Sequence, residues 1–198
     1  MGSWIGDGIG CDIGGDMSAR FYHAVVEFFF HHARRIPPQP AKLEVHYEHD
    51  RSRAGPIVSY FIRYFADRPI TTKHINQGLQ ALDPSFKIDL GELLRGDAAL
   101  GQLEVNQAKG DMFEDDLRQT VGMVQQTGRG QQIVPRLMAS QAIVVVAVEW
   151  NERGQDVTMD MLAPLWSVLA QLSPGLSQWD GNGIFDGGTQ LVDLSAAR

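Results

Sequence analysis

The chain has 198 residues, of which 43% are hydrophobic and 21% are charged, and its formal net charge is −7. This composition is typical of a soluble globular protein, and the longest wholly apolar run, 142–148, is much shorter than the about 20 residues that span a membrane. The single cysteine, Cys11, excludes an intrachain disulfide bond and favours the reducing environment of the cytoplasm.

The first sixteen residues contain six glycines, a composition that invites comparison with a phosphate-binding loop. Ile13 stands where a dinucleotide-binding fingerprint needs its third glycine, and the lysine of a triphosphate-binding loop is missing because the first lysine is Lys42. We therefore expect no cofactor here. Residues 1–16 are interpreted as a glycine-rich N-terminal arm, either docked on the protein or flexible, and 17–198 as a single domain.

The first predicted helix begins at Asp16 or Ser18 and ends before the proline-rich segment 36–40. Residues 42–49 then alternate apolar and polar side chains, as a half-buried strand does. The next apolar segment, 57–65, follows a polar turn that contains glycine and proline. These two segments are predicted to pair as a hairpin.

A short helix is predicted from Thr71 or Thr72 to Leu82, because Asp83 precedes a proline and so avoids helical angles. Strands are predicted over 86–90 and 101–106. The next helix begins with Asp111 as its cap and buries a stripe of apolar residues at helical spacing. These residues are Phe113, Leu117, Val121 and Val124.

Residues 142–150 are continuously apolar until Glu149, which predicts a central strand covered on both faces, with Val145 buried. A helix is predicted over 161–172, with Pro164 near its start or at a kink. The segment Asp186-Gly187-Gly188 between two short apolar runs predicts a hairpin near the end of the chain.

Strands that alternate with helices but include hairpins predict an α+β fold. We expect one domain with a largely antiparallel or mixed sheet and about four helices packed mainly on one side. A doubly wound parallel sheet is the alternative, and the hairpins disfavour it.

All six histidines fall within the first 74 residues, so a metal site is one hypothesis for this part of the chain. His23 and His31 lie eight residues apart on one predicted helical face, while His46 and His49 lie on or beside the first predicted strand. Three such groups could bind zinc, but the zinc-protease pattern is absent. Solvated or interface histidines are the favoured interpretation, and no metal site is predicted.

The remaining motifs give no catalytic assignment. The oxygen-bearing side chains at Asp180, Asn182 and Asp186 do not fit the spacing of a calcium loop and favour a polar hairpin instead. The acidic run 114–116 is interpreted as the first turn of a helix. A basic and aromatic span that includes Arg63, Tyr60, Phe61 and Tyr64 could stack on bases. The acidic net charge disfavours nucleic acid, and the aromatics are better explained as the core face of the predicted hairpin.

These observations favour a non-enzymatic cytoplasmic protein that binds another protein. A bacterial toxin-neutralising immunity protein is one such protein. The alternative is a metal-assisted hydrolase that uses the N-terminal histidines. The sequence leaves open whether the chain forms a homodimer, and we expect no membrane partner.

Overall fold

The computed structural model describes residues 59–150 and 153–195. This part of the chain forms one eight-stranded antiparallel sheet with the strand order β2-β3-β4-β5-β1-β6-β7-β8. The strands are β1 (Ser59–Ala66), β2 (Phe86–Asp89), β3 (Glu92–Arg95), β4 (Ala98–Gln107), β5 (Ala142–Glu149), β6 (Gly175–Trp179), β7 (Gly183–Asp186) and β8 (Thr189–Asp193). The helices of this part are α2 (Thr72–Leu82), α3 (Asp111–Gln126), the 3-10 helix η1 (Gln131–Ile133), α4 (Val134–Met138) and α5 (Gln155–Leu172). The predicted α+β class and antiparallel sheet are confirmed.

Strand β5 lies at the centre of the sheet, as its continuous apolar sequence predicts. It pairs with β4 on one side and β1 on the other, so that Val144 lies opposite both Val105 and Tyr64. Val144 and Val146 are fully buried, whereas Val145 points to the other face and is only partly buried. The burial predicted for Val145 is therefore correct only in part, because the second face of the sheet is covered less completely.

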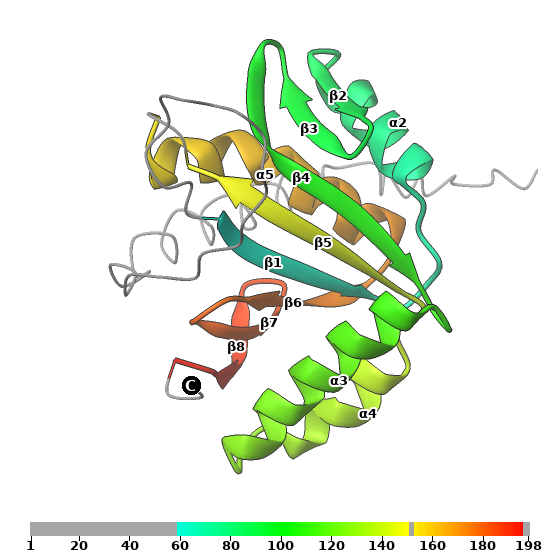
Figure 1. The fold of residues 1–198 in the computed structure, drawn as a ribbon, viewed down its shortest axis with the longest axis vertical. Helices are drawn as coiled ribbons and strands as arrows, with labels where there is room; N and C mark the ends of the chain where they lie inside the picture. The colour runs from blue at the N-terminus through cyan, green and yellow to red at the C-terminus, as the bar shows by residue number, and fades with distance from the viewer. Residues whose placement is uncertain (1–58, 151–152, 196–198) are drawn as a thin grey trace, which may run out of the picture.

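Helices cover both faces of the sheet. Alternate residues of β1, among them Tyr60 and Ile62, belong to the larger apolar cluster together with α2 and α5. Phe65 of the same strand belongs to a second cluster with α3 and α4. The expected packing on one side holds for α2 and α5, while α3 and α4 lie together at the opposite end of the molecule from α2 (Figure 1).

The described neighbours of β1 limit the part of this strand that the predicted first hairpin could use. Residues Ser59–Ala66 pair with β5, and Ile62–Ala66 also pair with β6. A strand has only two edges, so residues Ile62–Ala66 have no edge left for a preceding strand. The segment 42–49 itself lies outside the described residues.

Strands β2, β3 and the first part of β4 form an extension beside α2 at the upper end of the molecule (Figure 1). From here on we call this extension the arm; it is distinct from the N-terminal arm 1–16. The arm turns away from the rest of the sheet at a β-bulge: Leu93 pairs with Gly101 and Leu94 with Ala99, which leaves Leu100 as the extra residue of β4. Gly101 has φ +145°, and a Cβ atom added there would lie 2.1 Å from the carbonyl oxygen of Ala147. Glycine permits this close approach of two backbones, and the bulge redirects the arm.

Helix α2 begins and ends where its capping signals predict. In α3 the predicted cap Asp111 is instead the first helical residue, and Gly110 is the N-cap without a side-chain hydrogen bond. Thr71 caps α2 by accepting a hydrogen bond of 3.2 Å from the backbone N–H of His74, and α2 ends before Asp83 as predicted. Helix α5 begins at Gln155 rather than at 161. The sequence did not predict this earlier start because the first turns combine polar and apolar residues without a clear capping side chain. Pro164 consequently lies inside the helix and is buried.

The C-terminal hairpin is confirmed as β7 and β8, joined at Gly187, which has φ +53°. Strands β3 and β6 and helix α4 were not predicted from the sequence. Each has only four or five residues, which is too short for a periodic pattern.

Candidate functional site

The residues considered for a metal site all lie outside the described part of the chain. His23, His31, His46 and His49 belong to residues 1–58, as does the glycine-rich arm 1–16, so the metal-assisted hydrolase stays a proposal. Within residues 59–150 and 153–195, no three His, Cys, Asp or Glu side chains are grouped closely enough to hold a metal ion.

The three residues compared with a calcium loop point to three different partners. Asp180 accepts a hydrogen bond of 3.1 Å from Arg63, and Asn182 donates one of 3.2 Å to the hydroxyl of Tyr60. Asp186, at the end of β7, forms an ion pair with Arg136 of α4. The preferred interpretation of this segment as polar hairpins therefore agrees with the structure.

A polar network on the sheet face of α3 brings together residues that are far apart in the chain. Arg63 of β1 donates from Nε to Asp116 Oδ1 at 2.9 Å, and from one terminal nitrogen to Gln178 and Asp180 at 3.1 Å each. Asn106 of β4 donates to the second oxygen of Asp116 at 3.3 Å. We call Arg63, Asn106, Asp116, Gln178 and Asp180 the Arg63 network.

The Arg63 network ties α3 to three strands. The side chains of Arg63 and Asp116 are each only 13% exposed, so their charges are largely removed from water and depend on each other. Burial raises the pKa of the Asp180 carboxyl above its ordinary value, while the nearby Arg63 guanidinium opposes the rise. The acidic run 114–116 thus contains one residue, Asp116, that does more than begin a helix, and the spacing of the sequence gave no sign of its partner.

The aromatic residues of the basic span serve mainly as core. Tyr60 and Tyr64 are 1% and 8% exposed, and burial raises the pKa of both hydroxyl groups. Tyr64 donates a hydrogen bond of 2.8 Å to the carbonyl oxygen of Ser173. For these residues the structure agrees with the core interpretation rather than with a base-stacking surface.

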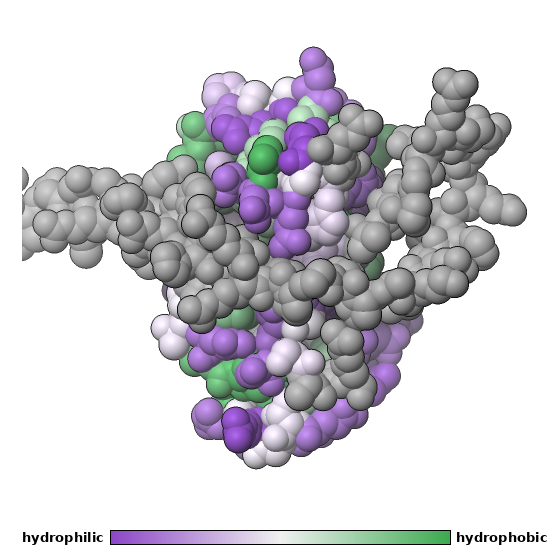
Figure 2. Space-filling view, turned by 90° about the vertical axis from the view of Figure 1, so that its left-hand side faces the viewer, coloured by the Kyte–Doolittle hydropathy of each residue, from purple (hydrophilic) through white to green (hydrophobic). Residues whose placement is uncertain are grey.

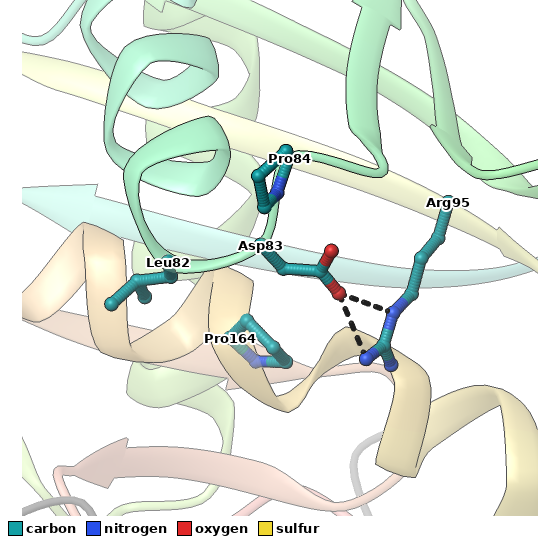
Figure 3. Close-up of a pocket in the computed structure, with 5 residues that line it drawn as sticks. All are labelled: Leu82, Asp83, Pro84, Arg95 and Pro164. Carbon is teal, nitrogen blue, oxygen red and sulfur yellow. Dashed lines mark hydrogen bonds and ion pairs between the residues drawn. The ribbon is translucent and has the colours of Figure 1, made fainter.

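A shallow pocket of about 410 Å³ lies between the end of α2, the start of the arm and the middle of α5 (Figure 3). Its lining residues are Leu82, Asp83, Pro84, Arg95 and Pro164. Arg95 donates from Nε to Asp83 at 3.0 Å, and its guanidinium lies 5.2 Å from the centre of the Phe86 ring. Asp83 is also held by the hydroxyl and backbone N–H of Ser85, at 2.6 and 2.9 Å. These contacts hold the arm against α2.

The most unusual residue of the arm is Leu90, at the turn between β2 and β3. Its exposure is 102% of the reference value, whereas the other large apolar residues exposed on the described surface reach 59% at most. It also has φ +48°, a left-handed conformation that a leucine rarely adopts because of its Cβ atom. Gly91 follows with φ +90°, so both central residues have the positive φ of a type I′ turn, in which asparagine and glycine are preferred.

The turn that carries Leu90 is firmly held. The backbone N–H of Leu103 in β4 donates to the carbonyl oxygen of Gly91 at 2.7 Å, and Asn76 of α2 accepts from the backbone N–H of Ile88 at 2.9 Å. Phe86 and Leu93, on the two strands of the hairpin, are completely buried. Leu90 is therefore exposed on a rigid support. Its sequence neighbourhood, Asp-Leu-Gly-Glu, carried no recognised turn signal, which is why sequence reasoning missed it.

None of the helices in the described part of the chain is both long and apolar enough to cross a membrane. Comparison of the chain with protein-family models, curated proteins and solved structures finds no match.

Proposed function

We propose that this chain is a non-enzymatic cytoplasmic binding protein that attaches to another protein through the turn Asp89–Glu92, which we call the β2–β3 tip. The single observation that carries the proposal is the full exposure of Leu90 in a left-handed backbone conformation. Such a residue is unfavourable for folding in two ways, since asparagine would fit the turn better and would also be hydrated. Unfavourable conformations that a rigid framework holds in place are concentrated at functional positions.

Burial of Leu90 by a partner supplies free energy that offsets the cost of its backbone conformation and of its exposure to water. Transfer of a leucine side chain from water into a protein interior is worth about 1.5–3 kcal/mol. Because the tip is already held by Leu103 and Asn76, little conformational freedom is lost when it binds. On the side of the molecule shown in Figure 2, hydrophilic residues cover most of the described surface and hydrophobic residues form small separate spots. The part of the described surface that is visible on this side thus shows no broad apolar patch.

The finer proposal is an immunity protein that neutralises a toxin. Its support is the formal net charge of −7, which suits an inhibitor that covers a basic surface. The test uses the partner protein that is captured by the photo-crosslinking experiment of the next paragraph. Expressed alone it should arrest growth, and expressed together with this chain it should not; a partner without effect on growth contradicts the immunity role but leaves the binding role intact.

The binding role is tested by photo-crosslinking in cells of the source organism. A diazirine-bearing amino acid replaces Leu90 in one variant and Val157 in the matched control, because Val157 is also apolar and is 49% exposed on the first turn of α5. We expect one defined protein adduct from position 90 and none of that mass from position 157. Equal labelling at both positions, or no adduct from position 90, would contradict the proposed function.

A further inference from the structure

Resting on the proposed function, we infer that the β2–β3 tip enters an apolar pocket of the partner protein whose rim carries lysine or arginine side chains. Leu90 fills the pocket, and the carboxylates of Asp89 and Glu92 pair with the rim. The juxtaposition of a fully exposed leucine with two acidic residues on a rigid turn points to this chemistry.

The two carboxylates are brought together by the register of the hairpin. Asp89 lies directly opposite Glu92 in the last pair of β2 and β3, and like charges in such a pair repel each other. Lys87 forms an exposed ion pair with Asp89, so one of the two negative charges is compensated on this chain. Glu92 forms no ion pair with any residue of 59–150 or 153–195. A cation supplied by the partner would relieve the repulsion that remains.

The charge of the tip also favours a protein over a lipid surface. A bilayer offers no fixed cations in the arrangement of a pocket rim, and the anionic lipids of a cytoplasmic leaflet would repel Asp89 and Glu92. Insertion of one leucine side chain yields too little free energy to hold a protein of this size on a bilayer, since even a whole myristoyl chain gives marginal binding.

A second copy of the chain is disfavoured by the same argument. In a two-fold contact in which the two tips meet at the axis, four carboxylates would be brought together. The net charge of −7 adds a long-range repulsion between copies.

The test uses the full chain and the protein captured by the crosslink at position 90, purified and mixed without crosslinking. The dissociation constant is measured at about 50 and about 300 mM salt, because attraction between charges is screened over this range. Leu90→Asn should weaken binding by about 30-fold or more, as expected of a central anchor. Glu92→Gln should weaken binding by about three- to tenfold at low salt and reduce the salt dependence. Glu104→Gln, on the exposed part of β4, is the matched control and should change neither quantity.

The outcomes separate the inference from the proposed function. A captured partner that binds with no salt dependence, or with equal affinity after Glu92→Gln, would refute the basic rim while the binding role stands. If crosslinking at position 90 captures no partner protein, both the inference and the proposed function are refuted. Crosslinking of position 90 to this chain itself, with twice the monomer mass in light scattering, would show a second copy instead. Cosedimentation with phosphatidylcholine vesicles that Leu90→Asn abolishes would show a lipid surface instead.

Discussion

Arg63 and Asp116 join the middle of the sheet to the second turn of α3 through a hydrogen bond of 2.9 Å between the guanidinium Nε and the carboxylate Oδ1. Both side chains are largely buried, so each makes the burial of the other tolerable. This pair holds α3 on a face of the sheet where Val145 is only partly covered. Removal of either member leaves a charge in a place that water barely reaches.

The first prediction concerns this pair. Arg63→Ala should lower the free energy of unfolding by about 3 kcal/mol, because Asp116 and Asp180 both lose their cation. Arg118→Ala is the control, since Arg118 pairs with Asp115 on the same helix but both side chains are more than 60% exposed; it should cost less than about 1 kcal/mol. Urea denaturation followed by circular dichroism measures both. Equal losses would show that the Arg63 network contributes no more than a surface ion pair.

The second prediction concerns the pH dependence of stability. Burial raises the pKa of Asp180, so the folded protein binds this proton more tightly than the unfolded chain does. This residue therefore makes stability decrease as the pH rises from about 4, the ordinary value, through the pKa of the folded state. Asp180→Asn keeps an oxygen acceptor for Arg63 and removes the charge. Relative to the unmodified protein, the variant should become progressively more stable across that range.

A variant at Asp193 should behave in the opposite way. Hydrogen bonds from the side chain and backbone of Ser195 lower the pKa of Asp193, so its contribution to stability is lost as the pH falls. Asp193→Asn should thus become relatively less stable as the pH rises from the lowered pKa of the folded state towards about 4, the ordinary value. If the stability differences of Asp180→Asn and Asp193→Asn change with pH in the same direction, the assignment of Asp180 to a desolvated site is wrong.

The parts of the fold that could be predicted are those with a long or well-capped pattern. Helix α2 has Thr71 at one end and Asp83 before a proline at the other, and β5 is apolar over nearly its whole length. Strand β3 escaped prediction because four residues between two glycines show no period. The Arg63–Asp116 contact spans 53 positions of the chain, and nothing local distinguishes either residue from its neighbours. Leu90 escaped prediction because its exposure depends on how β2 and β3 are fixed by β4 and α2, which only the fold determines.

The third prediction tests the bulge that redirects the arm. Gly101→Ala should lower the free energy of unfolding by at least about 2 kcal/mol, because the added Cβ would meet the Ala147 carbonyl oxygen at 2.1 Å and the backbone has φ +145°. Gly122→Ala is the matched control within α3, where an added Cβ has no neighbour within 4 Å. Helix propensity alone should make that variant more stable by about 0.5–1 kcal/mol. A Gly101→Ala protein with unchanged stability would mean that β4 and β5 do not approach as closely as described.

The fourth prediction separates stability from binding at Leu90. Leu90→Asn should raise the free energy of unfolding by about 0.5–1 kcal/mol, because asparagine tolerates the left-handed conformation of a type I′ turn and its side chain is well hydrated. Leu82→Asn is the control: Leu82 ends α2 with 49% of its surface exposed, and the same exchange should lower stability, since asparagine is a weaker helix former and fewer apolar atoms would pack at the shallow pocket. Thermal unfolding of the two variants beside the unmodified chain gives both signs. A higher free energy of unfolding for Leu90→Asn would mean that leucine is retained at this position although the fold prefers asparagine, as expected of a residue kept for a partner. A lower free energy of unfolding would show that Leu90 stabilises the folded chain itself. That result would remove the main support for the β2–β3 tip as a binding site.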